Sequence, residues 1–195
     1  MASASIRREG STKFGANNKW AWFPSVSAGW MISREDFMES QEVFDVLKFR
    51  AGFGITGSLP TDPYMSLATY GTGAGAWNAY TGSWLTATYG PNINPNPDLK
   101  WERKGEWNLG VDFAALNNRL NVTVDLYTRK VSDLLYKYKV PTPPYQYSSM
   151  LANVGDATSK GLEFSVSGTP VQNKNFSWTS SINFSFNTNK LDKLS

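Results

Sequence analysis

The stretch FSWTSSINFSFN, residues 176–187, alternates between apolar and polar side chains and decides the fold. Every even-numbered position except Ser180 carries Phe, Trp or Ile, whereas every odd-numbered position carries Ser, Thr or Asn. Successive side chains of a β-strand point to opposite faces, so this period of two predicts a strand with one apolar and one polar face.

The same alternation recurs along the chain and predicts about seven strands. Five further stretches show it: Val26–Ile32, Val46–Ile55, Trp101–Phe113, Leu120–Thr128 and Gly161–Gly168. We expect Ile6 and its neighbours to form the end of another strand. We therefore expect an all-β chain in which each strand is apolar along one face.

The segments between these stretches differ in length. Ala114–Arg119 and Thr169–Asn175 are short, and Arg34–Asp45 is intermediate, with room for a helical turn. The other connections are long and comprise residues 9–19, 56–100 and 137–153. In an antiparallel up-and-down meander, this order places the long loops at one end of the sheet and the short turns at the other. That layout is typical of bacterial outer-membrane barrels.

The length of the predicted strands also favours a membrane-spanning barrel. A strand of about 11 residues, tilted by about 45°, rises about 26 Å, close to the apolar band of such barrels. Two aromatic pairs, Trp101 with Phe113 and Trp22 with Trp30, fall near opposite ends of their strands, where we expect aromatic girdles. The predicted fold is an antiparallel up-and-down meander that forms about seven strands of a larger transmembrane β-barrel.

A soluble β-sandwich is the alternative, because its strands alternate in the same way. With 14% aromatic residues, such a domain would suit carbohydrate binding. The unequal loops and the many Ser, Asn, Glu and Lys residues on the polar faces favour a barrel with a water-filled lumen. The residues predicted to line that lumen include Lys48, Arg50, Glu102, Lys104, Glu106, Asp112 and Glu163.

Composition excludes several function classes. The chain contains neither Cys nor His, so it offers no thiolate nucleophile, imidazole base or Cys/His zinc site. The net charge is only +3 and the cations are scattered among acids, so we expect no nucleic-acid partner. The sequence has no apolar run of about 18 residues, so we expect no transmembrane helix, and because no apolar run follows Met1 we expect no signal peptide.

An enzyme is also not expected. Glu102 and Glu106 share a polar strand face, an arrangement that a paired-carboxylate hydrolase would use. Lys104 lies between them, however, so ion pairs along a lumen wall explain these charges more simply. We expect no cofactor and no metal, and we interpret Asn96 and Asp98, beside prolines, as a turn rather than a calcium site.

Six motifs resemble those of SusC/RagA-type TonB-dependent outer-membrane receptors, in the order in which that family has them. They are REGSTKFG (8–15), FPSVSAGW (23–30), LKFRAGFGITG (47–57), NPDLKWE (96–102), NVG (153–155) and KGLE (160–163). Together they cover almost the whole chain. Departures from the family pattern are mild, such as Glu9 for Asp and Gly52 for Ser, and none falls on a catalytic position.

The resemblance implies a barrel of about 22 strands in the outer membrane, closed by an N-terminal plug. It also implies import of glycans or peptides driven by TonB, with a SusD-like surface lipoprotein as a lid over the barrel. Residues 1–195 would then be a partial barrel domain without plug, TonB box or signal peptide. We expect an internal piece of a larger receptor, because an open sheet in lipid leaves the backbone groups of its edges unsatisfied.

The candidate ligand-binding segment is the long connection Asp62–Tyr89, where an oligosaccharide or peptide would bind. Its aromatic residues are Tyr64, Tyr70, Trp77, Tyr80, Trp84 and Tyr89. Aromatic faces stack on the apolar faces of sugar rings, and Trp and Tyr add a polar contact. The alternative is that these residues pack the loop or join a girdle. A second loop, Pro141–Tyr147, either faces the ligand or contacts the lid partner.

Overall fold

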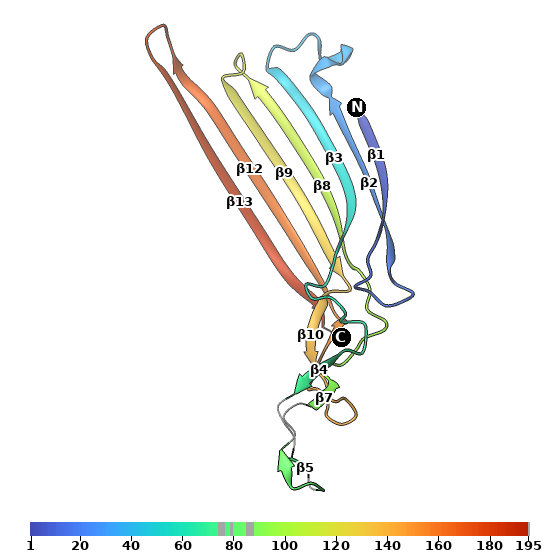
Figure 1. The fold of residues 1–195 in the computed structure, drawn as a ribbon. Helices are drawn as coiled ribbons and strands as arrows, with labels where there is room; N and C mark the ends of the chain where they lie inside the picture. Colours follow the sequence, from blue (N-terminus) through green and yellow to red (C-terminus); the bar gives the residue numbers. More distant parts are fainter. Residues whose placement is uncertain (74–76, 79, 85–87, 195) are drawn as a thin grey trace.

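The computed structural model of residues 1–195 describes residues 1–73, 77, 78, 80–84 and 88–194, and it is built around one seven-stranded antiparallel sheet (Figure 1). The strand order in this sheet is β1-β2-β3-β8-β9-β12-β13, so the seven strands lie side by side in the order in which they occur along the chain. The strands are β1 (Ala2–Gly10), β2 (Trp20–Met31), β3 (Phe44–Ser58), β8 (Glu102–Ala115), β9 (Leu120–Ser132), β12 (Asp156–Gln172) and β13 (Ser177–Lys193). The predicted all-β meander of seven strands is confirmed.

Register aligns the apolar positions of neighbouring strands into continuous rows. One row consists of Leu109, Leu126, Leu162 and Phe186, the next of Val111, Val124, Phe164 and Phe184, and a third of Phe113, Val122, Val166 and Ile182. Because side chains alternate along a strand, all three rows lie on one face, which we call the outward face. Most of these side chains are at least partly exposed, and no other described element covers them.

The short turns meet at one end of the sheet. Between β8 and β9, the residues Leu116, Asn117 and Asn118 all have positive φ, at 60°, 55° and 59°. The two asparagines tolerate this left-handed conformation well, as expected from the sequence, whereas Leu116 pays a steric cost. The amide of Asn118 donates to Asp45 Oδ2 at 2.8 Å. The helical turn predicted between β2 and β3 is confirmed as two short 3-10 helices, η1 (Ile32–Arg34) and η2 (Asp36–Met38).

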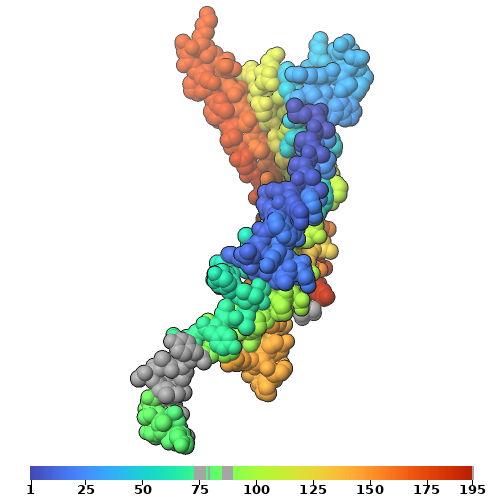
Figure 2. All heavy atoms as spheres, turned by 45° about the vertical axis from the view of Figure 1, so that its right-hand side comes forward, coloured from blue at the N-terminus to red at the C-terminus, as the bar shows by residue number. Residues whose placement is uncertain are grey.

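The long connections meet at the opposite end and carry small hairpins that the sequence did not predict. These pair β4 (Tyr70–Gly73) with β7 (Thr88–Pro91), β5 (Trp77–Asn78) with β6 (Ser83–Trp84), and β10 (Leu135–Lys139) with β11 (Ser149–Asn153). In Figures 1 and 2 the chain tapers away from the sheet at this end, and β5 and β6 lie farthest out. Among the described residues, no helix is long and apolar enough to cross a membrane.

The main buried apolar cluster lies at this loop end rather than under the sheet. Phe14, Phe23, Leu99 and Trp101 form it, and the Trp101 ring packs 4.8 Å from that of Phe14 and 5.3 Å from that of Phe23. The prediction that Trp101 belongs to an exposed aromatic girdle is therefore wrong, since Trp101 is only 6% exposed and its Nε1 donates to the Lys19 carbonyl. Trp22 and Trp30 are exposed, as a girdle requires.

Candidate functional site

The polar face of the sheet is organised around one arginine. Arg50 of β3 donates from Nε to Asp112 Oδ2 at 2.7 Å and from Nη2 to Asp112 Oδ1 at 2.9 Å, which joins β3 to β8. The same Nη2 lies 3.1 Å from Asp125 Oδ1 of β9. Thr123 Oγ1 adds a 3.2 Å hydrogen bond to Asp112 Oδ1. Three strands are thus tied together by one guanidinium, in the bidentate geometry that suits carboxylates.

Gly110 makes this arrangement possible. It pairs in register with Arg50, and the guanidinium crosses β8 directly over it. A Cβ at this position would lie 2.5 Å from Asp125 Oδ1 and 2.7 Å from Arg50 Cζ, closer than real Cβ contacts come. The absence of a side chain at position 110 therefore leaves the space through which Arg50 reaches β9.

The other charges predicted for the lumen are mostly paired on the same face. Arg129 donates from Nε to Glu106 Oε2 at 2.6 Å, and Lys104 Nζ lies 3.3 Å from Glu102 Oε1. Glu102 differs from the prediction, because it is buried and its Oε2 accepts a 3.1 Å hydrogen bond from the Leu135 amide. Glu102 thus interacts with Lys104 and a backbone amide, whereas Glu106 interacts with Arg129, so the two carboxylates have separate partners. In the described part of the chain, no three acidic side chains are grouped closely enough to hold a metal ion.

A network of hydrogen bonds at the loop end, which we call the rim network, anchors the long connections. The side chain of Asn153 accepts from the Lys100 amide at 2.9 Å and donates to the carbonyls of Lys100, at 2.7 Å, and Asp133, at 2.9 Å. Lys100 Nζ also lies 2.9 Å from Asp133 Oδ1. These contacts join the segment before β8 to the segment before β10 and to the last residue of β11.

Further polar contacts extend the rim network to the other loops. Asn96 donates from Nδ2 to the Leu151 carbonyl at 3.0 Å, and its amide donates to the Met65 carbonyl at 3.1 Å. Lys13 Nζ donates to the carbonyls of Pro60 and Thr61, both at 2.9 Å. Asn96 also caps a turn by accepting from the Asp98 amide, which agrees with the interpretation of this segment as a turn.

Sequence reasoning missed the rim network, although Lys13, Asn96, Lys100 and Asn153 lie in the motifs that carry the family resemblance. Gly15 shows how closely these motifs pack, because a Cβ there would lie 1.7 Å from the Pro97 carbonyl oxygen. The signal that could have indicated the network is the concentration of Asn, Gly and Lys in loop segments outside any alternating pattern. Asn side chains hydrogen-bond readily to backbone groups in turns, and Gly permits the close backbone approach that such turns need.

Four of the six candidate ligand-binding aromatics have described side chains, and these four lie on separate elements. Tyr64, with φ at 63°, lies in the segment before β4, and Tyr70 begins β4; both side chains are exposed. Tyr80, 98% exposed, and Trp84 belong to the β5–β6 hairpin, the outermost described part of the chain. The side chains of Trp77 and Tyr89 lie outside what the structure describes. Ligand binding by these six residues stays a prediction.

The second predicted loop, Pro141–Tyr147, packs against the segment that follows β7. Asn94 Nδ2 donates to the Tyr147 carbonyl at 2.6 Å, the Tyr147 amide donates back to Asn94 Oδ1 at 3.2 Å, and the Tyr147 hydroxyl donates to the Pro91 carbonyl. Both segments therefore share one surface at the loop end. Whether a ligand or a lid partner contacts it stays a prediction.

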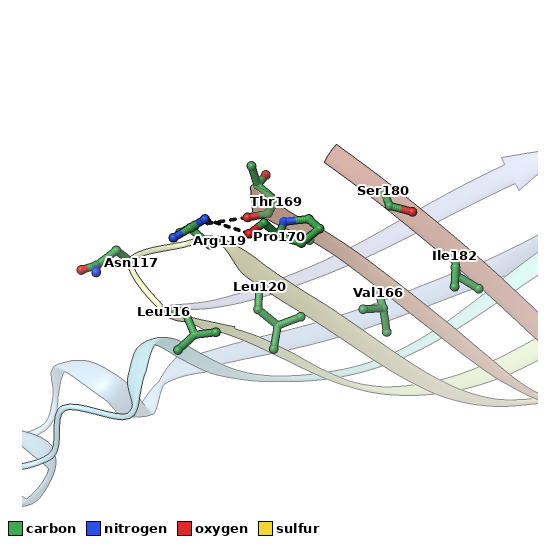
Figure 3. Close-up of a pocket in the computed structure, with 10 residues that line it drawn as sticks. Leu116, Asn117, Arg119, Leu120, Val166, Thr169, Pro170, Ser180 and Ile182 are labelled. Carbon is green, nitrogen blue, oxygen red and sulfur yellow. Dashed lines mark hydrogen bonds between the residues drawn. The ribbon is translucent and has the colours of Figure 1, made fainter. Parts of the chain in front are cut away.

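The outward face is hollowed at its turn end, where the apolar alternation is interrupted (Figure 3). Gly168 and Ser180 are paired in register, and both are small, which leaves a hollow of about 580 Å³ among Leu120, Val166 and Ile182. Arg119 borders the hollow and donates to the carbonyls of Thr169, at 3.2 Å, and Pro170, at 3.1 Å. The serine that interrupts the alternation in residues 176–187 thus faces outward with the apolar rows.

A twisted sheet with an exposed apolar face, an ion-paired polar face, short turns at one end and long loops at the other defines a segment of a transmembrane β-barrel. The family model for the β-barrel of TonB-dependent receptors matches residues 1–194. The chain belongs to this family of outer-membrane receptors.

Relatives and solved structures agree with the family. The chain is 38% identical to TonB-dependent receptor P39 of Formosa agariphila, over 100% of this chain and 18% of that protein. It is 36% identical to TonB-dependent receptor SusC of Bacteroides thetaiotaomicron, over 97% of this chain and 19% of SusC. It superposes on a chain of the RagAB peptide importer with a TM-score of 0.86 and 30% identity, over 99% of this chain and 20% of that chain. The chain therefore spans about a fifth of the length of these proteins.

The alternative of a soluble β-sandwich is not favoured. A sandwich buries its apolar faces between two packed sheets. In the described part of the chain the apolar face of the seven-stranded sheet has no second sheet against it, and the remaining sheets have two strands each. The polar face of a barrel segment lines the lumen and the apolar face contacts lipid, as the sequence predicted.

Proposed function

We propose that residues 1–195 are one portion of the barrel domain of a TonB-dependent importer that takes up glycans or peptides. The observation that carries the proposal is the division of the sheet into an ion-paired lumen face and an uncovered apolar face. It extends across strands whose arrangement is that of the RagAB peptide importer, at 30% identity over 99% of this chain. In the complete receptor the partners are TonB and a SusD-like surface lipoprotein.

The role of this portion is structural rather than catalytic. The acids that could form a hydrolytic pair are held by neighbouring groups, Glu102 by the Leu135 amide and Glu106 by Arg129. A receptor that imports nutrients does not need to cleave them at the barrel wall. The ion pairs around Arg50 keep the strands in register while the lumen stays polar.

The long connection 62–89 supplies part of the external ligand surface. Tyr80 and Trp84 are exposed on the outermost described hairpin, where a ligand that approaches the barrel from outside meets them first. Stacking on an aromatic face suits both sugar rings and peptide side chains. The rim network holds the base of this connection through Asn96 and Met65.

The test of uptake uses the full-length receptor that contains this segment. A strain that lacks the receptor is grown on defined oligosaccharides or on oligopeptides as the limiting nutrient, with and without TonB. We expect a growth defect on one of these nutrient classes, restored by the receptor only when TonB is present. Normal growth of the deletion strain on every glycan and peptide tested would refute an import role.

The ligand surface is tested separately with Tyr80→Ala/Trp84→Ala in the full-length receptor, with Phe37→Ala at the turn end as the matched aromatic control. Loss of stacking on two rings lowers the affinity for the imported ligand by about 10-fold or more. The control retains wild-type affinity. Unchanged affinity of the double variant would exclude these residues from the ligand surface and leave the import role intact.

A further inference from the structure

The outward face changes from apolar to basic toward the loop end. Beyond the row of Leu109, Leu126, Leu162 and Phe186, register places a row of Trp107, Thr128, Lys160 and Thr188, and then a row of Gly105, Lys130, Thr158 and Lys190. Residues two apart on a strand share a face, so these lysines point to the same side as the apolar rows. Arg103, two residues before Gly105, continues this basic region on β8.

Among the described residues, fewer of these cations form ion pairs than those on the lumen face do. Arg50 and Arg129 are matched by carboxylates across the strands. On the outward face, Lys190 lies 3.6 Å from Asp192, whereas Arg103, Lys130 and Lys160 form no ion pair with any described residue. Asp156, the other acid at this end of β12 and β13, lies opposite Lys193 in register. All of the basic residues on this side are exposed.

An apolar hollow lies directly beside the lysines. It measures about 570 Å³ and is lined by Leu109, Leu126, Leu162 and Phe186 toward the middle of the sheet, and by Trp107, Thr128, Lys160 and Thr188 toward the loop end. One end of the hollow therefore suits hydrocarbon, and the other offers an ammonium group and two hydroxyls. Lys130 and Lys190 stand one row further out, where a headgroup above the hydrocarbon would lie.

We propose that this basic patch and hollow bind an anionic, phosphate-bearing lipid of the membrane leaflet on the loop side. Its acyl chain occupies the hollow over Leu126 and Leu162, and its phosphate contacts Lys130, Lys160 and Lys190. The patch matches the negative charge of such a headgroup, and lysines at the headgroup level of a membrane attract anionic lipids. The proposal depends on the sheet lying in the membrane and is independent of which nutrient the receptor imports.

The experiment uses the full-length receptor, purified in a non-ionic detergent and titrated with dioleoylphosphatidylglycerol, with bound lipid counted by native mass spectrometry. Dioleoylphosphatidylcholine has the same chains but no net charge and serves as the lipid control. The variant is Lys130→Gln/Lys160→Gln/Lys190→Gln, and the matched protein control is Lys137→Gln/Lys139→Gln/Lys174→Gln, three exposed lysines outside the patch.

We expect the patch variant to bind phosphatidylglycerol on the order of 100-fold more weakly than the wild type, about fivefold for each lysine. The control variant and the charge-preserving Lys130→Arg/Lys160→Arg/Lys190→Arg retain the wild-type affinity. Equal losses in the patch and control variants, or equal wild-type affinity for the two lipids, would overturn the proposal. If the triple Gln variant does not fold, Lys160→Gln alone is measured, and an unchanged affinity would be equally decisive against the proposal.

Discussion

Arg50 and Asp112, which lie 62 positions apart in the sequence, form a bidentate ion pair across β3 and β8, with N–O distances of 2.7 and 2.9 Å. Lys48, two residues before Arg50, is the residue that pairs with Asp112 in the β-sheet register. Arg50 therefore reaches diagonally to its carboxylate partner and, over Gly110, to Asp125 on the next strand. On the lumen face, ion pairs between side chains therefore join these three strands in addition to the backbone hydrogen bonds of the sheet.

The first prediction concerns Gly110→Ala in the full-length receptor. The new Cβ would occupy the space of Arg50 and Asp125, so at least one charged hydrogen bond must break, which costs about 1–3 kcal/mol of unfolding free energy. The matched control is Gly105→Ala on the same strand, where a Cβ meets no atom within 4 Å. Urea unfolding in detergent measures both variants. Equal stability of the two would show that Arg50 has another route to β9.

The second prediction tests which face contacts lipid. Val124 lies in the central apolar row, so Val124→Arg places a charge in hydrocarbon and costs about 2–4 kcal/mol of unfolding free energy in a bilayer. Ser167 of β12 lies on the opposite face, and Ser167→Arg is tolerated because the lumen is wet. Reversible unfolding from lipid vesicles compares them. A larger cost for Ser167→Arg would mean that the two faces have been assigned the wrong way round.

The third prediction concerns the buried cluster at the loop end. Phe14 is 1% exposed and packs on Trp101. Phe14→Ala therefore leaves a cavity and lowers the unfolding free energy of the loop end by about 3–5 kcal/mol. Tyr136→Ala, an exposed aromatic of β10, changes stability by less than about 0.5 kcal/mol. Thermal melting of the receptor reports the difference. A Phe14→Ala variant as stable as Tyr136→Ala would argue against a packed core at the rim.

The fourth prediction concerns Asn153→Asp in the rim network. The carboxylate can still accept from the Lys100 amide but cannot donate to the carbonyls of Lys100 and Asp133. We expect faster amide hydrogen exchange in residues 133–153, by about 10-fold, because two hydrogen bonds at the base of the hairpin are lost. Asn189→Asp on β13, whose side chain has no hydrogen bond to a described residue, is the control. Identical exchange rates in both variants would show that the Asn153 side chain does not stabilise the rim network.

Much of the fold was predictable because its signal is local. The alternation of residues 176–187 determines a two-faced strand wherever that strand lies, and loop lengths determine the antiparallel meander. The strands extend beyond the alternating stretches, however: β13 continues to Lys193, well past Asn187. Pairing with β12 holds these added residues extended, although their own pattern does not require it.

The sites were less predictable. Trp101 looked like a girdle residue because it stands at the end of an alternating stretch, but contacts with Phe14 and Phe23 bury it. The six aromatic residues of the long connection were identifiable by type, whereas their distribution over β4, β5–β6, β7 and the segment before β4 depends on hairpins too short to leave a periodic signal.

The sequence by itself determined which residues are polar and which apolar on each strand, and hence the class of fold and the family. Only the tertiary structure decided that Arg50 bridges Asp112 and Asp125, that Asn153 joins Lys100 to Asp133, and that Lys130, Lys160 and Lys190 gather beside one apolar hollow. The physical reason is that facial alternation is a property of each strand alone. Charge pairs, anchors and hollows instead depend on the register between strands, and that register brings together residues from distant parts of the chain.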